Sequence, residues 1–358
     1  MKQVKNLRYG YTTGACAAAA ARGAAMALLT QTTVQDAYIT LPEGEEVKFA
    51  LGYCGFDTFK ATCCVIKDAG DDPDITDKAE ICATVRWRKD PGIVIEGGVG
   101  VGRVTKPGLD IPVGMAAINK VPREMIAQSV EEVVGKGKGT EVRISVPQGE
   151  ELARKTLNPR LGITGGISII GTSGIVVPYS KEAYTASISL ALDIALANGC
   201  REIVLTTGRR SEKSAQREFP FREESFVQMG DFVGFALDEC GKRDLDRVII
   251  WGMIGKISKL AQGAVDVNVK DSRVDIDFLT HTAAECGVPE SSVTTLKEAV
   301  TAHHFLGMLP ERGVREVCSR LCFLACQTIR EHTGGNSDAE CVMSDKNGVI
   351  LGRAYVKQ

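Results

Sequence analysis

Residues 157–180 read LNPRLGITGGISIIGTSGIVVPYS, and this stretch decides the fold that we expect. The mostly branched apolar run 167–170 is typical of a strand covered on both faces, as in a parallel sheet. A Gly-Thr-Ser-Gly turn follows at 171–174, and Ser180 with Glu182 suits the start of a helix. Because small residues at the carboxyl end of a strand let a ligand reach main-chain N–H groups, the stretch predicts a strand, a ligand-binding turn and a helix.

The second half of the chain, from residue 166, alternates short apolar runs with helical segments. This is the pattern of a parallel sheet covered by helices. The expected elements are a helix over 181–198 that ends at Gly199, a strand over 202–205, a helix with its apolar face over 226–240, a strand over 248–251 and further helix to about residue 332. We therefore expect a Rossmann-like α/β domain with a mainly parallel sheet over residues 166–335.

The first half, residues 1–165, has a different pattern. One long apolar helix over 15–29 is followed by short alternating runs, which predict a mostly antiparallel α+β domain. The expected strands lie at 38–41, 47–51, 62–66, 81–87 and 142–146. The last segment, 336–358, contains Asn347-Gly348 and predicts a tight hairpin, which we assign to neither domain.

Composition limits the classes of function. The chain has 358 residues, 44% of them apolar, and a formal net charge of −2, so no general basic surface favours nucleic acid or an anionic membrane. No run approaches the roughly 20 apolar residues of a membrane span. The alanine-rich run 15–29 is interrupted by Arg22 and Gly23, so we interpret it as a buried helix and not as a signal peptide. Twelve cysteines without a secretion signal indicate mostly free thiols in a cytoplasmic protein.

Polar and basic residues follow the expected strands. The strand 202–205 leads into Thr206, Thr207, Gly208, Arg209 and Arg210, and the strand 248–251 leads into Lys256 and Lys259. In open α/β sheets the ligand crevice lies at these carboxyl ends, and arginine is well shaped for carboxylates. The pattern predicts a site for an anionic small molecule.

Four motifs occur in order along the chain: LRYGYTTGACAAA at 7–19, KDAGDDPD at 67–74, TLNPRLGITGGISIIGTSGIV at 156–176 and TTGR at 206–209. In these motifs, and over nearly its whole length, the chain resembles the cobalt-precorrin-5B C-1-methyltransferases of anaerobic cobalamin biosynthesis. The resemblance implies that a methyl group passes from S-adenosylmethionine to carbon 1 of cobalt-precorrin-5B to give cobalt-precorrin-6A. The cobalt would arrive chelated in the substrate, so we predict no protein-bound metal.

The resemblance also gives the predicted site residues their roles. The donor is expected at Gly171, Thr172, Ser173, Gly174, Thr206, Thr207 and Gly208, and the tetrapyrrole at Thr12, Thr13, Arg209, Arg210, Lys256 and Lys259, with the basic residues anchoring its carboxylates. No catalytic residue is assigned. Two other classes stay open, a non-catalytic carrier of an anionic tetrapyrrole or nucleotide and an α/β hydrolase that uses Ser173. No nucleic-acid or membrane partner is expected, and a homo-oligomer is left open.

Overall fold

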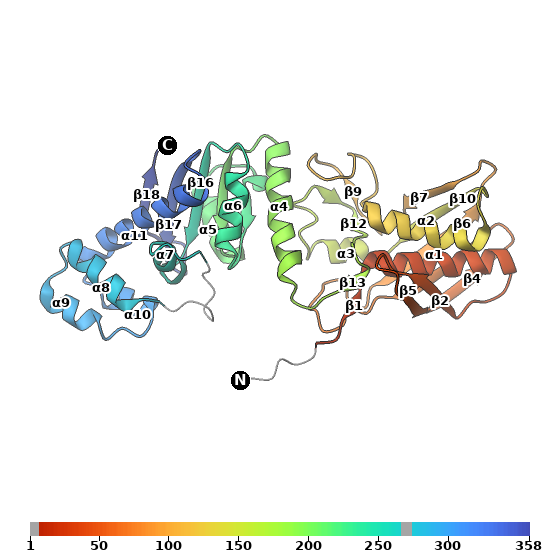
Figure 1. The fold of residues 1–358 in the computed structure, drawn as a ribbon, viewed down its shortest axis with the longest axis horizontal. Helices are drawn as coiled ribbons and strands as arrows, with labels where there is room; N and C mark the ends of the chain where they lie inside the picture. The colour runs from red at the N-terminus through yellow and green to blue at the C-terminus, as the bar shows by residue number, and fades with distance from the viewer. Residues whose placement is uncertain (1–6, 266–273) are drawn as a thin grey trace. The chain divides into compact units, whose positions relative to one another are not determined.

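The computed structural model describes residues 7–265 and 274–358, so part of the expected helical region, 266–273, lies outside the described residues. The chain forms two compact units, Met1–Ser180 and Lys181–Gln358 (Figure 1). The sequence places a boundary after residue 165 and keeps 336–358 apart. The structure instead divides the chain after Ser180, and it includes the last segment in the second unit.

Over residues 7–180, the first unit consists of many short strands and three helices. Its elements are β1 (Gly10–Tyr11), α1 (Thr13–Thr30), β2 (Asp36–Thr40), β3 (Glu46–Ala50), β4 (Tyr53–Phe56), β5 (Lys60–Ile66), β6 (Glu80–Trp87), β7 (Ile93–Gly97), β8 (Gly100–Val101), β9 (Arg103–Val104), α2 (Lys120–Val134), β10 (Thr140–Ser145), α3 (Gly149–Ala153), β11 (Ile163–Thr164), β12 (Gly166–Ile167) and β13 (Ile175–Val176). The five strands expected in this half are all present, as β2, β3, β5, β6 and β10.

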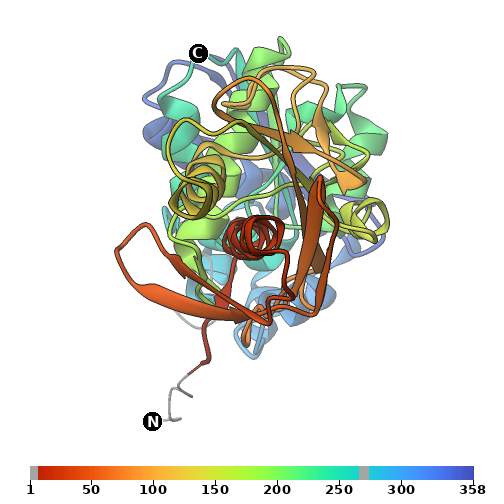
Figure 2. The ribbon, with the colours of Figure 1, turned by 90° about the vertical axis from the view of Figure 1, so that its right-hand side faces the viewer.

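A five-stranded sheet forms the centre of the first unit, in the order β4-β5-β6-β10-β7. Its pairs are antiparallel except for β10 and β7. Helix α1 packs on this sheet beside α2, and Figure 2 shows both helices nearly end-on. Because its alanines are small, α1 is buried along almost its whole length, which confirms the buried helix expected over 15–29.

The run 167–170 is not a strand of the second sheet, so that expectation is wrong. Strand β12 pairs with β8, Ile169 bridges to Ile118, and β13 pairs with β1, all within the first unit. A buried apolar run looks the same in sequence whichever sheet it joins, because the local pattern reports burial and not the pairing partner.

The second unit contains the larger parallel sheet. Its elements are α4 (Lys181–Ala197), β14 (Glu202–Thr206), α5 (Arg209–Glu218), the short 3-10 helix η1 (Glu223–Ser225), β15 (Phe226–Gln228), α6 (Val233–Gly241), β16 (Arg247–Gly252), α7 (Ile254–Leu260), α8 (Ile276–Glu285), α9 (Glu290–Leu296), α10 (Ala302–Met308), α11 (Glu311–His332), β17 (Asp338–Ser344) and β18 (Ile350–Val356). The helix expected over 181–198 and the strands expected at 202–205 and 248–251 are confirmed as α4, β14 and β16.

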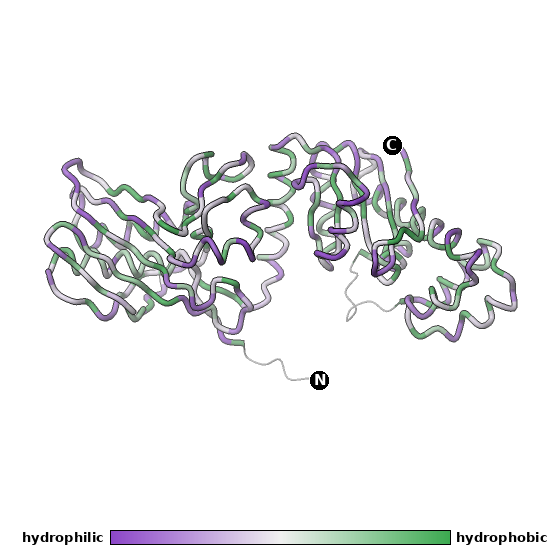
Figure 3. Tube along the Cα trace, turned by 180° about the vertical axis from the view of Figure 1, so that it is seen from behind, coloured by the Kyte–Doolittle hydropathy of each residue, from purple (hydrophilic) through white to green (hydrophobic). Residues whose placement is uncertain are grey.

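The strand order of this sheet is β15-β14-β16-β17-β18, with β18 alone antiparallel to its neighbour. One face packs against α4, α6, α7 and α11, and the other packs against α5 and the phenylalanines that follow it. Apolar stretches along both units can be followed in Figure 3. Mixed α/β structure with parallel strands is therefore present.

Two details of the second unit differ from expectation. Residues 226–228 form strand β15, which pairs with β14, so the following helix begins at Val233 and not near Phe226. The C-terminal segment is a hairpin of β17 and β18, but β17 also pairs in parallel with β16 and so completes the sheet.

Ten of the cysteines are free, which confirms the prediction that most are thiols, whereas Cys64 and Cys82 form a disulfide that the sequence did not indicate. Across residues 7–265 and 274–358, no helix combines the length and the apolar character needed to cross a membrane.

Candidate functional site

A cavity of about 260 Å³, lined mostly by residues with polar side chains, lies at the carboxyl ends of the parallel strands of the second unit. The residues that line it come from the turn after β14, from the first turns of α5, and from the ends of β16 and β17. They are Thr207, Gly208, Arg209, Arg210, Ser211, Ser214, Met253, Ser344 and Asp345. Because β15 and β17 lie on opposite sides of the β14–β16 pair, the chain leaves β14 in one direction and β16 in the other, and such a reversal opens a crevice for ligands.

The turn after β14 positions the cationic wall of this cavity. Strand β14 ends at Thr206, and α5 begins at Arg209 with Gly208 as its N-cap residue. The Ser211 hydroxyl donates to the Gly208 carbonyl at 2.9 Å and lies 3.0 Å from the Thr207 hydroxyl. The first N–H groups of a helix have no carbonyl partner within the helix and carry partial positive charge, so this end of α5 favours an anion.

Arg209 and Arg210 are exposed at the mouth of the cavity. Among the residues that the structure describes, neither guanidinium is paired with a carboxylate. An arginine without a partner can offer two parallel N–H groups to an incoming carboxylate. The structure thus brings Arg209 and Arg210 together with Thr207 and Gly208 at one cavity, and binding of an anion there stays a prediction.

The two predicted lysines have other surroundings. Lys256 forms an ion pair with Asp231 at 2.8 Å and donates to the Gly230 carbonyl at 3.0 Å, and Lys259 is buried, with 4% of its surface exposed. Neither lines the cavity, and Thr206 is buried below it. The loop after β16 turns directly into α7, which carries both lysines away from the strand end.

Sequence reasoning missed Ser344 and Asp345, which also line the cavity, at the end of β17. Ser344 accepts a hydrogen bond from the Trp251 indole at 2.9 Å, and Asp345 accepts the main-chain N–H groups of Asn347 and Val349 at 2.8 Å. The signal available was the Asp-Lys-Asn-Gly turn itself. The sequence does not show that this turn lies at the cavity, because that placement follows from the pairing of β17 with β16.

The turn 171–174 lies in the first unit against the start of α1. The Thr13 hydroxyl accepts the Ile170 N–H at 2.9 Å, the Thr12 N–H donates to the Gly174 carbonyl at 2.9 Å, and the Thr12 hydroxyl caps α1 by accepting the Ala15 N–H at 3.2 Å. The structure therefore brings Thr12 and Thr13 together with the 171–174 turn. Their hydroxyls already have partners in the fold.

The local structure by itself requires glycine at both glycine positions of this turn. Gly171 and Gly174 have φ values of +130° and +82°, which side chains other than glycine rarely adopt. A Cβ at Gly171 would lie 2.3 Å from the Thr12 hydroxyl, and one at Gly174 would lie 2.7 Å from Leu41. Close packing and backbone conformation thus account for both glycines without a ligand, while Thr172 stays exposed.

Three of the four motifs meet in the first unit. The Arg8 guanidinium donates to both carboxylate oxygens of Asp68, which joins the first two motifs, and the Ile170 N–H donates to the Thr13 hydroxyl at 2.9 Å, which joins the first and the third. Just beyond the third motif, the Asp72 carboxylate accepts the Tyr179 N–H at 2.9 Å. The hydrogen bond from Arg8 holds the pKa of Asp68 below its usual range. The motifs at 7–19, 67–74 and 156–176 therefore form one connected structure around the start of α1.

A buried ion pair lies within the 67–74 motif. Lys67 is 1% exposed, and its ammonium group donates to Asp74 at 2.6 Å. Burial acts to raise the pKa of Asp74, but Lys67 and Thr76 outweigh it, so the pKa is lowered.

The geometry around Ser173 does not resemble that of a hydrolase. Its hydroxyl exchanges hydrogen bonds with the main chain of Ile175 at 3.3 and 3.4 Å. Within the described part of the chain, none of its partners is a histidine or a carboxylate. A serine nucleophile needs a base within hydrogen-bond reach, so this reading has no geometric support.

An open, mostly parallel sheet with helices on both faces and an arginine-lined cavity at its carboxyl edge define an α/β protein whose site suits a small anionic group. The chain belongs to the CbiD family. The CbiD family model matches residues 1–178, and the model described as CbiD, C-terminal domain matches residues 266–355.

Curated relatives of the chain share one name, cobalt-precorrin-5B C(1)-methyltransferase. The protein from Geobacillus thermodenitrificans (strain NG80-2) is 50% identical over 358 residues, covering 99% of this chain and 96% of the relative. The one from Priestia megaterium is 46% identical over 357 residues, covering 99% and 97%. A 1.9 Å crystal structure of cobalamin biosynthesis protein (cbiD) from Archaeoglobus fulgidus is 30% identical and covers 74% of this chain and 83% of that chain, with a TM-score of 0.38.

Proposed function

We propose that this protein catalyses the S-adenosylmethionine-dependent methylation of C-1 of cobalt-precorrin-5B, which gives cobalt-precorrin-6A in anaerobic cobalamin biosynthesis, and that it acts in the cytoplasm. The observation that carries the proposal is identity of 50% along 99% of the chain to relatives named for this reaction. The relatives are covered almost completely, so both units belong to the proposed enzyme.

The cavity of the second unit is proposed to hold one carboxylate arm of the substrate. The tetrapyrrole carries many carboxylates, whereas the chain as a whole has a net charge of −2, so binding needs local cations. A volume of about 260 Å³ is below the usual 300–1,000 Å³ of small-molecule pockets, so the cavity suits an arm of a large ligand and not the macrocycle. Arg209 and Arg210 supply charge, and the start of α5 supplies N–H groups.

The second unit is proposed to be a Rossmann-like domain. The order β15-β14-β16-β17 and the placement of the cavity beyond β14 and β16 support this reading. The two compact units are proposed as the two domains of the enzyme, with the C-terminal hairpin assigned to the second.

The methyl donor is proposed to be S-adenosylmethionine, and its contacts have two candidate locations. One is the Thr207-Gly208 turn of the second unit, and the other is the 171–174 turn of the first unit. Thr172 and Thr207 carry the side chains that test them, since the glycines of the first turn are needed for the fold itself. Calorimetric titration of Thr172→Val and Thr207→Val with S-adenosylhomocysteine distinguishes the two, because only one variant should lose affinity.

The proposed methyl transfer does not require an ionisable side chain as a strong acid or base. Methyl transfer from a sulfonium is an in-line displacement, in which the protein aligns donor and acceptor carbon and excludes water. Cobalt enters as part of the substrate. No residue is proposed as a catalytic base.

The decisive experiment is anaerobic incubation of the protein with cobalt-precorrin-5B and donor labelled in its methyl group. Label should appear in the tetrapyrrole, and S-adenosylhomocysteine should form only when both substrates are present. Ser173→Ala should retain the activity if it folds. Folded protein that binds the tetrapyrrole without transferring label would instead be a carrier.

A further inference from the structure

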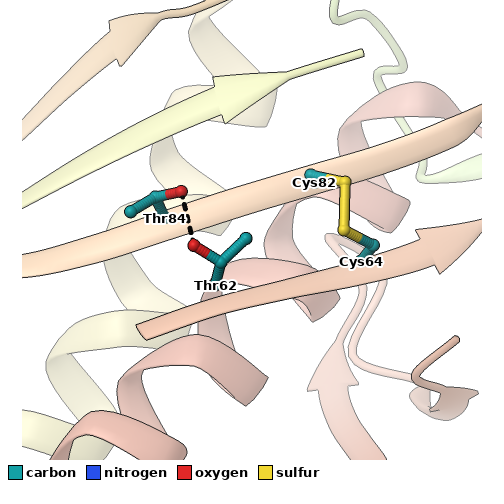
Figure 4. The surroundings of a disulfide bond; sticks show 4 residues. All are labelled: Thr62, Cys64, Cys82 and Thr84. Atoms are coloured by element: carbon teal, nitrogen blue, oxygen red, sulfur yellow. Dashed lines mark hydrogen bonds between the residues drawn. A yellow bond between two sulfur atoms is a disulfide. The ribbon is translucent and has the colours of Figure 1, made fainter. Parts of the chain in front are cut away.

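Cys64 and Cys82 occupy directly opposite positions on neighbouring strands of the first sheet. They are joined as a disulfide in β5 and β6 (Figure 4), with Cα atoms 4.0 Å apart. On the same side of the sheet, the Thr62 and Thr84 hydroxyls lie 2.8 Å apart. Seven consecutive residue pairs hold β5 and β6 in register, and this register places the two sulfurs next to each other.

The pair lies at the base of a loop that carries one of the family motifs. Residues 67–79 connect the end of β5 to the start of β6, and only two residue pairs separate the cysteines from this loop. The loop contains the buried Lys67–Asp74 ion pair, the carboxylate that binds Arg8, and the carboxylate that accepts the Tyr179 N–H. A covalent link at this position would limit how far an opening of the loop could extend into the hairpin.

Several of the other thiols are in different environments, although Cys54 lies directly opposite Cys63 on the neighbouring strand β4. Cys63, the neighbour of Cys64, points to the opposite side and packs in the core beneath α1. Burial raises the pKa of Cys16 and of Cys240 to about 12, so these groups stay as thiols that react slowly. Cys64 and Cys82 are also buried, at 4% and 8% exposed, but they are flanked by the partly exposed Thr62 and Thr84.

We propose that Cys64 and Cys82 are a reversible thiol-modification site, oxidised by low-molecular-weight disulfides, that controls the opening of the 67–79 loop. One cysteine thiolate attacks glutathione disulfide, breaks its S–S bond and releases one glutathione thiolate. The second cysteine then attacks the resulting mixed disulfide and releases the second glutathione. The S–S bond between Cys64 and Cys82 forms, two protons leave the protein thiols, and glutathione disulfide takes up the two electrons.

The redox property does not depend on the proposed methyl transfer. Because the strand register places the sulfurs together in both states, the reduced pair should re-form its bond after reduction instead of exchanging with other cysteines. The oxidised state should hold the 67–79 loop closed, and the reduced state should let it open more often.

The test equilibrates the full-length wild-type chain in buffers of reduced and oxidised glutathione, then traps free thiols by alkylation and maps peptides by mass spectrometry. We expect one linked peptide, Cys64 to Cys82, that rises and falls reversibly with the buffer, while the other ten cysteines remain alkylatable after denaturation. Amide hydrogen exchange in 67–79 should be at least threefold faster in the reduced protein, with no change in the second unit.

Two variants sharpen the result. Cys82→Ser should show fast exchange in both buffers, whereas Cys63→Ser, the matched control on the opposite side of β5, should respond like wild type. Should Cys82→Ser fail to fold, the wild-type titration decides alone. Three results would overturn the proposal. The Cys64–Cys82 pair could stay reduced in every buffer, other cysteines could pair in preference to it, or amide exchange in 67–79 could be the same in the oxidised and the reduced protein. The proposal would also be overturned by a reduced protein that holds one zinc ion on Cys64, Glu80 and Cys82, whose ligand atoms lie within 4.8 Å of one another, and that resists oxidation.

Discussion

Replacing Arg209 by alanine should weaken binding of the tetrapyrrole while leaving the fold intact. Arg209 is the first residue of α5 and lines the cavity at the carboxyl end of β14. Its side chain is exposed and has no ion-pair partner among the described residues, so its removal breaks no ion pair of the folded protein. The variant therefore isolates the interaction with a ligand.

The expected loss follows from the chemistry of one charged hydrogen-bonding group. A hydrogen bond to a charged group contributes about 1.5–3 kcal/mol. Because Arg209 is exposed and solvent screens its charge, the lower end of that range applies. A loss of about 1.5 kcal/mol corresponds to a roughly tenfold higher Kd. The remaining affinity should come from Arg210 and the N-terminal N–H groups of α5.

The assay is titration of the purified variant with cobalt-precorrin-5B under anaerobic conditions, beside a thermal melting curve. Arg217→Ala is the matched control, since Arg217 is also exposed and lies on α5, but in its last turn and outside the cavity wall. The melting temperature should be unchanged in both variants. Equal affinity in wild type and Arg209→Ala, or an equal loss in Arg217→Ala, would refute the assignment, because a general charge effect acts on both positions.

Three further predictions concern stability. Three side chains hold the pKa of Glu239 at about 2, and Lys242 has the largest effect. Glu239→Gln should therefore lower the free energy of unfolding by about 1.5–3 kcal/mol near pH 7. In urea titrations this difference between variant and wild type should disappear as the pH falls from about 4.5 toward 2. Asp74→Asn leaves the buried Lys67 without its carboxylate and should cost about 3–5 kcal/mol, whereas the double variant with Lys67→Met should recover much of that loss in the same titrations. Gly174→Val places a branched residue at φ +82° against Leu41. The melting temperature of this variant and its affinity for S-adenosylhomocysteine should therefore fall together. Lost affinity at an unchanged melting temperature would instead show that the donor contacts this turn.

Local features of the fold were predictable because their causes lie within a few neighbouring residues. The helix over 181–198 follows from its apolar spacing and the glycine after it, and the strands at 202–205 and 248–251 follow from short apolar runs. The alternating runs of the first half also lie where they were expected. Each of these helices and strands has a buried face, and the spacing of its apolar residues in the sequence follows from that burial.

The candidate site was predictable only in part. The Thr207 to Arg210 segment was found because a turn between a strand and a helix, rich in small and basic residues, carries its own local signal. Lys256 and Lys259 were included by the same argument, but helix α7 begins at Ile254 and removes them from the cavity wall. The direction of a side chain beyond a strand end depends on where the next helix starts, which a single basic residue does not reveal.

Sequence by itself determined the family of the chain, the existence of a helix-covered parallel sheet, and the basic turn at 207–210. Only the tertiary structure decided which strands pair: that 166–176 joins the first unit, that Ser344 and Asp345 line the same cavity as Thr207, and that Cys64 meets Cys82. The physical reason is the same in each case. Burial and turn formation leave a pattern within a short window, whereas strand pairing depends on contacts between segments far apart in the chain, whose hydrogen bonds use a backbone that every residue shares.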